Sequence, residues 1–327
     1  MLPPLGFTLL RCLSNGEVHS GEALAATVGL TRARVSQLLR DVELAGLRLE
    51  RLPGRGYRLL DPSPFLERAA ILHALRQTRV KPSIEIVDCI DSTNSELSRR
   101  AQGGDDVHRK LLAAEWQTAG RGRRGRGWTA VAGGSLTFSL AWRFEQGAGF
   151  LAGLPLAAGV ALARALDAIG FKGVELKWPN DLVHRHCKLG GILIELSGDA
   201  LGPSLAVIGV GLNVRLPAFA RRDIDQAVTD LGSMSRQQCI DRNVLLASLA
   251  GGLAEMLESY ERTGFGPLRA EWQSRHAFQG KAVRVVLPDG DVARGEVVGV
   301  DSDGALILNQ SGRRLRFVSG EVSLRAP

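Results

Sequence analysis

The sequence is poor in the residue patterns that mark disulfide frameworks and metal sites. Its four cysteines, Cys12, Cys89, Cys187 and Cys239, lie far apart, and no two of them form a CxxC pair. Zinc sites and disulfide frameworks both depend on closely spaced or regularly paired cysteines. The sequence therefore predicts free, buried thiols instead of either kind of site.

Long apolar runs are also missing. No apolar stretch reaches the roughly 18 residues that a membrane-spanning helix needs, and the N-terminus lacks the basic and then apolar pattern of a signal peptide. We therefore expect a cytoplasmic protein with no membrane partner. The sequence also lacks a G-x-x-x-x-G-K-[ST] motif, so any bound ATP is not held by a P-loop.

The composition is that of a folded, moderately basic protein. The chain has 327 residues, of which 45% are hydrophobic, enough for one enzyme core with one or two small accessory domains. Lysine and arginine total 41 against 34 acidic residues, and the formal net charge is +7. This balance permits binding to phosphates or nucleic acid, so the location of the basic residues matters more than their number.

Two capped helical patterns follow each other near the N-terminus. Ser20 and Thr31 are suited to cap the two helices, and Gly29 lies in the short turn between them. Such a pair is typical of a helix-turn-helix, and the segments 49–51 and 57–59 predict a hairpin wing after it. The alternative is a small helical domain with a solvated basic face. The side chains expected to face DNA are Arg32, Arg34, Ser36, Gln37, Arg40 and, on the wing, Arg55.

Changes of pattern divide the chain into three predicted domains. Residues 1–62 would bind DNA, and the Asp-Pro-Ser-Pro segment at 61–64 marks a linker. Residues 63–276 mix β-rich and helical stretches, which favours an α+β domain with a mixed or largely antiparallel sheet. Residues 277–327 alternate in hydrophobicity between turns and predict a small β-barrel. The expected strands of the middle domain are 84–87, 111–115, 135–142, 191–196 and 205–214, and its expected helices include 151–169 and 243–260.

The most unusual segment runs from Gly120 to Trp128, where four arginines are interleaved with four glycines. Its G-x-G-x-x-G spacing resembles a dinucleotide fingerprint, but no apolar helical face follows it up to Gly134, so we reject that function. Glycines allow close backbone approach to a ligand, and guanidinium groups grip carboxylate or phosphate oxygens. We expect a mobile loop that holds an anionic ligand. The alternative is an RNA-binding or disordered Arg/Gly segment.

A predicted helix start offers groups for an uncharged ligand. Thr93 and Glu96 have capping-box spacing at the beginning of this helix. A helix start presents free N–H groups, and Ser, Thr and Asn side chains lie beside them in the segment 91–96. Capping alone could also explain the pattern.

Two further segments suit a nucleotide. Lys177, Asp181 and Lys188 surround a predicted hairpin, where the carboxylate could hold Mg²⁺ and the ammonium groups could neutralise phosphate oxygens. The alternative there is a surface ion pair. The segment 209–214 ends an apolar strand with glycines, which suits either close approach of the backbone to a nucleotide or a β-bulge.

Five motifs resemble those of the bifunctional biotin protein ligase and biotin operon repressor family, in the same order and at the same spacing. They are IDSTN (Ile90 to Asn94), QTAGRGRRGRGW (Gln117 to Trp128), KWPNDL (Lys177 to Leu182), KLGGILIE (Lys188 to Glu195) and GVGLNV (Gly209 to Val214). The likeness extends to both ends of the chain. It implies an N-terminal winged helix-turn-helix, a central catalytic domain of the biotin/lipoate ligase type and a C-terminal SH3-like β-barrel. Two departures are Gly190, where the family often has Ala, and the segment 216–230, which shows little of a motif.

The same resemblance implies roles for individual residues. The arginine-rich segment would close over biotin and its adenylate. The residues that would bind biotin are Ser92, Thr93, Asn94, Gln117, Arg121, Gly122, Arg123 and Lys188. Those that would bind the nucleotide are Arg121, Arg123, Arg124, Lys177, Asn180, Asn213 and Arg325. Those that would act in catalysis are Lys188, Arg123, Lys177 and Asp181, with Asp181 also holding Mg²⁺.

The implied activity is a two-step ligation that uses ATP and Mg²⁺. Biotin and ATP would form biotinyl-5′-AMP, and biotin would then pass to a lysine of a biotin carboxyl carrier protein, an acetyl-CoA carboxylase subunit. The chain would also bind operator DNA as a repressor of biotin synthesis genes, as a homodimer once the adenylate is bound. Two alternatives stay open: a ligand-sensing repressor without ligase activity, which an assay of AMP formation would identify, and a lipoate-type ligase, which lipoate competition would identify.

Overall fold

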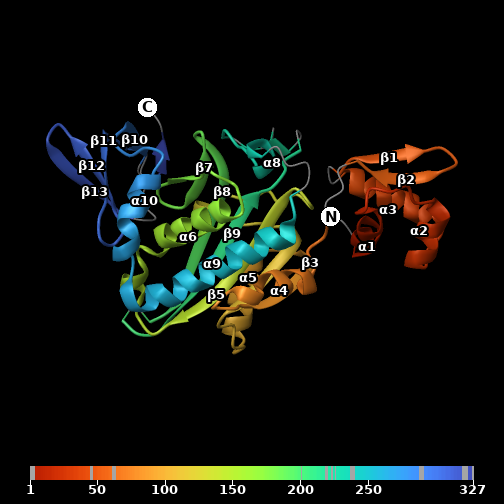
Figure 1. Ribbon diagram of the computed structural model, residues 1–327, viewed down its shortest axis with the longest axis horizontal. Coiled ribbons are helices and arrows are strands. Elements are labelled where there is room, and N and C mark those ends of the chain that lie inside the picture. Colours follow the sequence, from red (N-terminus) through yellow and green to blue (C-terminus); the bar gives the residue numbers. More distant parts are fainter. Residues whose placement is uncertain are drawn as a thin grey trace.

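The computed structural model describes residues 4–44, 47–60, 64–199, 201–217, 220–221, 224, 226–235, 240–286, 291–318 and 323–325. Figure 1 shows a helical N-terminal part, a central sheet covered by helices and a small C-terminal sheet along the long axis of the molecule. Residues 61–63 of the expected linker, residues 287–290 of the C-terminal segment and Cys239 lie outside the described residues.

The N-terminal part has a hydrophobic core of its own. Both expected caps are confirmed, because Ser20 Oγ accepts the N–H of Ala23 at 3.0 Å and Thr31 Oγ1 accepts the N–H of Arg34 at 3.3 Å. Gly29 ends the first capped helix in a left-handed conformation, with a φ of 66°. The core includes Phe7, Leu10, Leu24, Leu38 and Leu39. The elements are α1 (Pro4–Leu13), α2 (Gly21–Val28), α3 (Arg32–Leu44), β1 (Leu49–Leu52) and β2 (Gly56–Leu59).

The central sheet has seven strands in the order β3-β4-β5-β9-β8-β7-β6. β3 and β4 are parallel and the other neighbouring pairs are antiparallel, so the expected mixed sheet is confirmed. The parallel pair needs a crossover connection, which α5 (Thr93–Gln102) supplies. The strands are β3 (Ser83–Ile90), β4 (Lys110–Gln117), β5 (Ser135–Phe144), β6 (Glu175–Lys177), β7 (Asp181–His184), β8 (Cys187–Gly198) and β9 (Ser204–Asn213).

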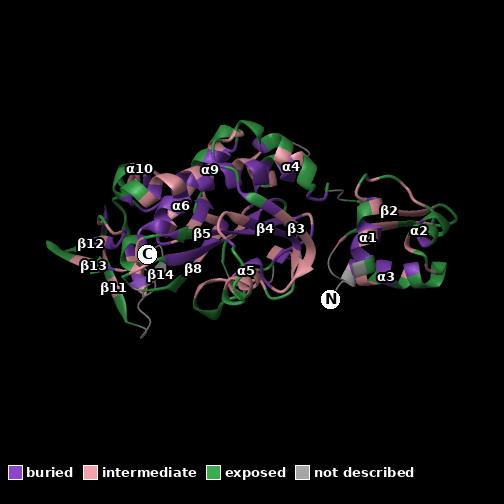
Figure 2. Ribbon diagram, turned by 90° about the horizontal axis from the view of Figure 1, so that it is seen from below, coloured by how far each residue is buried: buried purple, intermediate pink, exposed green. Residues whose placement is uncertain are grey.

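Helices cover both faces of this sheet. In Figure 2, α4, α6 and α9 lie on one face and α5 lies on the other. The segment Ala148–Ala168 is apolar enough over 21 residues to span a membrane, a longer run than the sequence led us to expect. However, 72% of its most apolar window is buried inside the protein, as in a core helix. The other α-helices among the residues described after the N-terminal part are α4 (Arg68–Ala74), α6 (Leu154–Ala168), α8 (Leu231–Met234), α9 (Arg242–Thr263) and α10 (Arg269–Arg275).

The C-terminal sheet is antiparallel and has the strand order β13-β12-β11-β10-β14. Its inward side chains, such as Val285 and Leu308, belong to the same hydrophobic core as the central helices and sheet. The small sheet is therefore packed against the central part through a shared core. Its strands are β10 (Ala282–Val286), β11 (Val292–Val300), β12 (Leu306–Gln310), β13 (Arg313–Phe317) and β14 (Ser323–Arg325).

A buried ion pair lies beneath the end of β4. Arg242 at the start of α9 contacts Glu115 at 2.7 Å, and the two side chains are 1% and 0% exposed. The same carboxylate accepts the backbone N–H of Leu66 at 2.5 Å. The next residue of β4, Trp116, packs against the N-terminal core. The end of β4 is thus fixed from below and in contact with the N-terminal part.

Candidate active site

One large cavity, of about 1120 Å³, lies where the ends of β4 and β9 meet β8 and the start of α5. Every predicted ligand-binding residue except Arg325 lines this cavity: Ser92, Thr93, Asn94, Gln117, Arg121, Gly122, Arg123, Arg124, Lys177, Asn180, Asp181, Lys188 and Asn213. Folding therefore brings together all five sequence motifs. Arg325 lies on β14, where its backbone pairs with Arg284, and its side chain is outside the described part of the chain.

The start of α5 supplies three buried polar side chains to the cavity. Ser92, Thr93 and Asn94 are each 3% exposed. The helix is capped by Ser92, whose Oγ accepts the N–H of Ser95 at 3.4 Å, so the expected capping role of Thr93 is wrong by one residue. Because Ser92 does the capping, the hydroxyl of Thr93 is available to the network that lines the cavity.

That network joins α5 to β4, β5 and β8 by hydrogen bonds. The Thr93 N–H donates to Gln117 Oε1 at 2.7 Å, and Thr93 Oγ1 lies 2.6 Å from Ser139 Oγ. Ser139 donates to Asn94 Oδ1 at 2.6 Å, and Asn94 Nδ2 donates to Glu195 at 2.9 Å. We call Thr93, Asn94, Gln117 and Ser139 the cavity floor. It is uncharged, and it suits a polar ligand group without charge.

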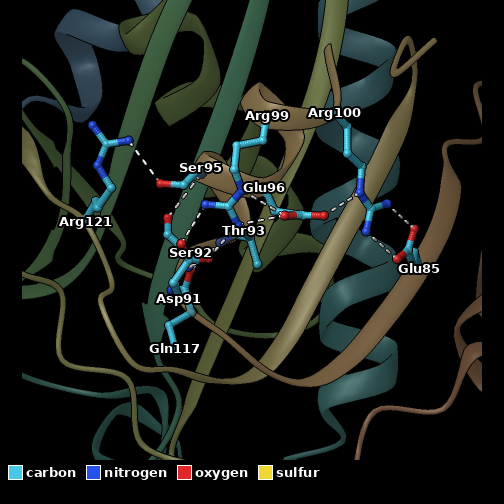
Figure 3. A network of polar contacts seen from close by, with 10 residues as sticks. All are labelled: Glu85, Asp91, Ser92, Thr93, Ser95, Glu96, Arg99, Arg100, Gln117 and Arg121. Carbon is cyan, nitrogen blue, oxygen red and sulfur yellow. Dashed lines mark hydrogen bonds and ion pairs between the residues drawn. The ribbon is translucent and has the colours of Figure 1, made fainter. Parts of the chain in front are cut away.

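Charged residues fix the outer side of α5 (Figure 3). Arg99 pairs with Asp91 at 2.7 Å and with Glu96 at 2.7 Å, and Arg100 links Glu96 to Glu85 on β3. Hydrogen bonds from Arg99 lower the pKa of Asp91 to about 2. Since these pairs lie outside the cavity, their role is to hold α5 in place above the sheet.

The segment Gly120 to Trp128, which we call the arginine loop, folds back on itself. The Gly122 N–H donates to Arg126 O at 2.7 Å, and the Trp128 N–H donates to Gly120 O at 2.8 Å. A Cβ atom on Gly120 would lie 2.4 Å from the carbonyl oxygen of Trp128, which explains the glycine. Only a short 3₁₀ turn, Arg123–Gly125, interrupts the loop, so the rejection of a dinucleotide-binding helix is confirmed.

All four arginines of this loop line the cavity, and Arg121 and Arg123 bond to residues of neighbouring elements. Arg121 pairs with Glu195 at 2.7 Å and donates to Ser95 Oγ at 3.2 Å. Arg123 donates to Asn180 Oδ1 at 3.2 Å. Burial, together with the neighbouring Arg124 guanidinium, lowers the pKa of Arg123. A partly desolvated cation of this kind favours an anionic ligand, because an anion would offset the unfavourable environment.

The β7–β8 hairpin places a lysine and a carboxylate in the same cavity. Lys188 Nζ lies 2.9 Å from Asp181 Oδ1, and the side chains are 18% and 16% exposed. This is a half-buried pair inside the cavity, so the alternative of a surface ion pair is wrong. Mg²⁺ is commonly held by one or two carboxylates together with substrate phosphates. Among the described residues, no group of three or more His, Cys, Asp or Glu side chains could hold a metal ion by itself, so Asp181 fits a Mg²⁺ that arrives with phosphate.

The glycines of β9 admit two side chains to the cavity. A Cβ atom on Gly209 would lie 2.3 Å from Asn94 Oδ1, and one on Gly211 would lie 2.4 Å from the Trp128 ring. β9 pairs with β5 and β8 without a register shift, which excludes the β-bulge considered for this segment. Asn213, at the end of the strand, donates its amide to Thr229 O at 3.0 Å and to Lys188 O at 3.4 Å. It thereby fixes the backbone that carries Lys188.

The predicted DNA-facing residues lie away from this cavity, on the N-terminal part. Ser36 is half-buried on α3. Gln37 donates to Asp41 at 3.4 Å on the same helix. The exposed residues of the set are Arg32, Arg34, Gln37, Arg40 and Arg55.

Two family models match the chain, the biotin/lipoate A/B protein ligase family over residues 86–213 and the biotin protein ligase C terminal domain over residues 278–325. The chain is also similar to the bifunctional ligase/repressor BirA of Escherichia coli K12, with 36% identity over 321 residues, 97% of this chain and 96% of that protein. The chain belongs to the biotin protein ligase family.

Other biotin protein ligases are similar over most of the chain. The biotin–[acetyl-CoA-carboxylase] ligase of Mycobacterium tuberculosis is 35% identical over 246 residues, 73% of this chain and 88% of that protein. The biotin protein ligase of Aquifex aeolicus, solved in complex with biotin and ATP, superposes with a TM-score of 0.63 at 27% identity, over 75% of this chain and 99% of its own. The central mixed sheet and the small C-terminal sheet are thus the biotin protein ligase fold.

Within this biotin protein ligase fold, several residues of the site were not predicted from the sequence. Ser139 lies in a strand with no motif, and only its register opposite Gly209 brings it to the floor. Glu195 ends the KLGGILIE motif, and an acidic residue in an otherwise apolar strand was the signal that could have revealed it. Trp128 lines the cavity, and its buried Nε1 has no hydrogen-bond partner in the structure.

Proposed function

We propose that this chain joins biotin to ATP through an acyl-adenylate and then transfers biotin to a lysine of a biotin carboxyl carrier protein. One observation carries the proposal: a single cavity combines an uncharged hydrogen-bonding floor with cationic walls formed by Arg121, Arg123 and Lys188. Biotin has an uncharged ureido ring at one end and a carboxylate at the other. The two kinds of wall match the two ends of that molecule.

The chemistry needs no nucleophile from the enzyme. A biotin carboxylate oxygen attacks the α-phosphorus of ATP and diphosphate leaves, which forms the mixed anhydride. The amine of the acceptor lysine then attacks the anhydride carbonyl, loses a proton, and AMP leaves. Lys188 and Arg123 would stabilise the negative charge that develops on phosphate oxygens, and the cavity would hold both reactants in line.

Roles of individual residues follow from where they lie. The floor, with Ser92, would hold the ureido ring, and the arginine loop would cover the adenylate and keep water from the anhydride. Asp181 would hold Mg²⁺ together with the phosphates of ATP, because one or two protein carboxylates and substrate phosphates are the usual ligands of this ion. The residues proposed for the nucleotide side are Arg124, Lys177, Asn180, Asn213 and Arg325.

The test is transfer of labelled biotin to a biotin carrier domain, with and without ATP and Mg²⁺. We expect ATP-dependent labelling in the wild type and its loss in Lys188→Ala. Lys172→Ala is the matched control, because Lys172 is an exposed lysine that does not line the cavity. Labelled lipoate should not be transferred. Absence of labelling by the wild type would contradict the proposal.

We further infer that the N-terminal part is a winged helix-turn-helix that binds DNA as a repressor. The α2–α3 pair, the β1–β2 hairpin and the exposed arginines support this inference. So does the full-length similarity to a protein named ligase/repressor, since the M. tuberculosis ligase matches only 73% of the chain. The C-terminal sheet would be an SH3-like barrel. The repressor would act as a homodimer once the adenylate is bound.

Selection from a random duplex library, with biotin and ATP present, tests the repressor function. We expect an enriched sequence whose affinity falls steeply with salt, because arginine contacts to phosphates release counterions. Arg34→Ala should flatten that dependence. Failure to enrich any sequence would leave the chain as a ligase alone.

A further inference from the structure

The cavity floor has a hydrogen-bond network with only one consistent direction. Glu195, which is ion-paired with Arg121 at 2.7 Å, is a carboxylate and only accepts hydrogen bonds. The side-chain amide of Asn94 lies 2.9 Å from it and must therefore turn its Nδ2 toward Glu195. An oxygen at that position would face a carboxylate oxygen with no proton between them.

This orientation fixes every proton further along. Asn94 Oδ1 faces Ser139 Oγ at 2.6 Å, so the single hydroxyl proton of Ser139 is donated to Asn94. Ser139 must then accept at its other contact, and the 2.6 Å contact with Thr93 Oγ1 takes the proton of Thr93. The hydroxyl of Thr93 has no proton left for a ligand and offers only lone pairs.

The other end of the network is set by the backbone. Gln117 Oε1 accepts the Thr93 N–H at 2.7 Å, so the amide oxygen of Gln117 points at the helix start. The Nε2 group of Gln117 is consequently the part of this amide that is free to donate to a ligand. The floor thus presents an acceptor at Thr93 and a donor at Gln117, both of which line the cavity.

We propose that Glu195 and Ser139 are positioning residues that set the direction of this network, so that the floor selects a ligand with an N–H donor next to a C=O acceptor. A cyclic urea has this pattern. The proposal rests on the proposed function, because the ureido ring of biotin is the cyclic urea in question. Glu195 acts through Ser139 and Asn94 and does not itself contact the ring.

The isosteric change Glu195→Gln removes the carboxylate that only accepts hydrogen bonds and thereby orients Asn94. A glutamine at this position can donate or accept, so only the longer contact of Asn94 Nδ2 with Leu193 O, at 3.3 Å, still favours the original direction. Asn94 can then turn over, and the network can run in reverse. Thr93 would then present a proton to the N–H of the ligand, which is a mismatch. In Ser139→Ala the Thr93 hydroxyl keeps only its longer contact to Gln117 Oε1, at 3.2 Å, so its proton can likewise turn toward the ligand. We expect about tenfold weaker binding of biotin in each variant, as for loss of one buried hydrogen bond.

The decisive probes are biotin and its cyclic carbamate analogues, in which an oxygen replaces one ring N–H or the other. The wild type should prefer biotin over at least one carbamate by about tenfold or more. In that carbamate a lone pair of the ring oxygen would face a lone pair of Thr93 Oγ1. Glu195→Gln and Ser139→Ala should each reduce that preference toward unity. The double variant should reduce it no further, because both residues act on one network.

Several controls separate this idea from simpler ones. Glu96→Gln is the matched substitution, since Glu96 pairs with Arg99 and Arg100 on the outer side of α5, and it should leave the preference unchanged. Thermal unfolding checks that each variant is folded. If Ser139→Ala does not fold, the isosteric variant Glu195→Gln alone tests the proposal. An unchanged preference in Glu195→Gln, or additive effects in the double variant, would overturn the proposal. A wild type that binds no biotin would instead refute the proposed function.

Discussion

The cavity floor and the arginine loop face the same cavity but are built in opposite ways. Floor residues such as Thr93, Asn94 and Ser139 are buried, uncharged and joined by hydrogen bonds from three different strands and a helix. The loop residues Arg121 and Arg124 are exposed and charged, and the loop is held mainly by its own backbone. The difference shows how one cavity can bind both a neutral ring and an anion. Buried hydrogen bonds of the floor select the ring, and the cations of the loop stabilise the negative charge.

The largest expected effect concerns the support beneath the floor. Arg242→Ala would leave Glu115 as an unpaired buried charge under the strand that carries Gln117, and should lower the free energy of unfolding by about 3–5 kcal/mol. Chemical denaturation measures this. The control is Arg164→Ala, whose ion pair with Glu271 is partly exposed and should contribute less than about 1 kcal/mol. Equal losses in the two variants would show that the floor does not depend on the buried pair.

Removing the charge of the cavity wall comes next. Lys188→Ala should slow adenylate formation by about 10²–10³-fold, as for other groups that stabilise developing charge. Exchange of labelled diphosphate into ATP in the presence of biotin reports this step. The free energy of unfolding should change little, since the side chain lies in the cavity and not in the core. A variant that is slow only because it is unfolded would contradict the assignment of Lys188 to the chemistry.

Two neighbouring glycines of β9 allow the floor and the loop to be damaged separately. Gly209→Ala pushes on Asn94, and Gly211→Ala pushes on Trp128, the last residue of the arginine loop. Overpacking of this kind commonly costs about 1–3 kcal/mol. We expect Gly209→Ala to raise the KM for biotin about tenfold or more, and Gly211→Ala mainly to shorten the lifetime of the bound adenylate. The distinction between floor and loop fails if both variants show the same pattern.

The smallest effect is expected from acid. Asp91 has a pKa of about 2 in the folded protein against an ordinary value of 3.8, so its stabilising contribution is present above about pH 4 and is lost as pH falls through 2. The Asp91 and Arg99 side chains are 43% and 52% exposed, so the contribution should stay below about 1 kcal/mol. Comparing the free energies of unfolding of wild type and Asp91→Asn between pH 2 and 6 tests the size and direction of this effect, and the substitution should cost more at pH 6 than at pH 2.

Much of the fold followed from local patterns in the sequence. Alternation and apolar runs located the central strands, and the caps at Ser20 and Thr31 were correct because the side chains act on residues only three positions away. The choice between Ser92 and Thr93 as cap could not be made, because adjacent hydroxyls satisfy the same spacing rules. Helix α1 has no cap signal to reveal it.

The ligand-binding residues of the site were more predictable than the hydrogen bonds that join them to one another. The arginine loop and the lysines stand out as charges in an ordered part of the chain, so their meeting in one cavity was expected. Ser139 and Glu195 lie 45 and 101 residues from Asn94, and only strand register places them beside it. Nothing local in the sequence encodes such long-range pairings.

Calorimetric titration with biotin and with biotin methyl ester tests the division between floor and loop most directly. The ester keeps the ureido ring and lacks the negative charge. Arg123→Gly should weaken binding of biotin by about tenfold or more, as for loss of a charged hydrogen bond, and leave binding of the ester nearly unchanged. Gly209→Ala should weaken both ligands equally. If Arg123→Gly weakens the ester as much as the acid, the loop does not act by holding the anionic end, and the account is wrong.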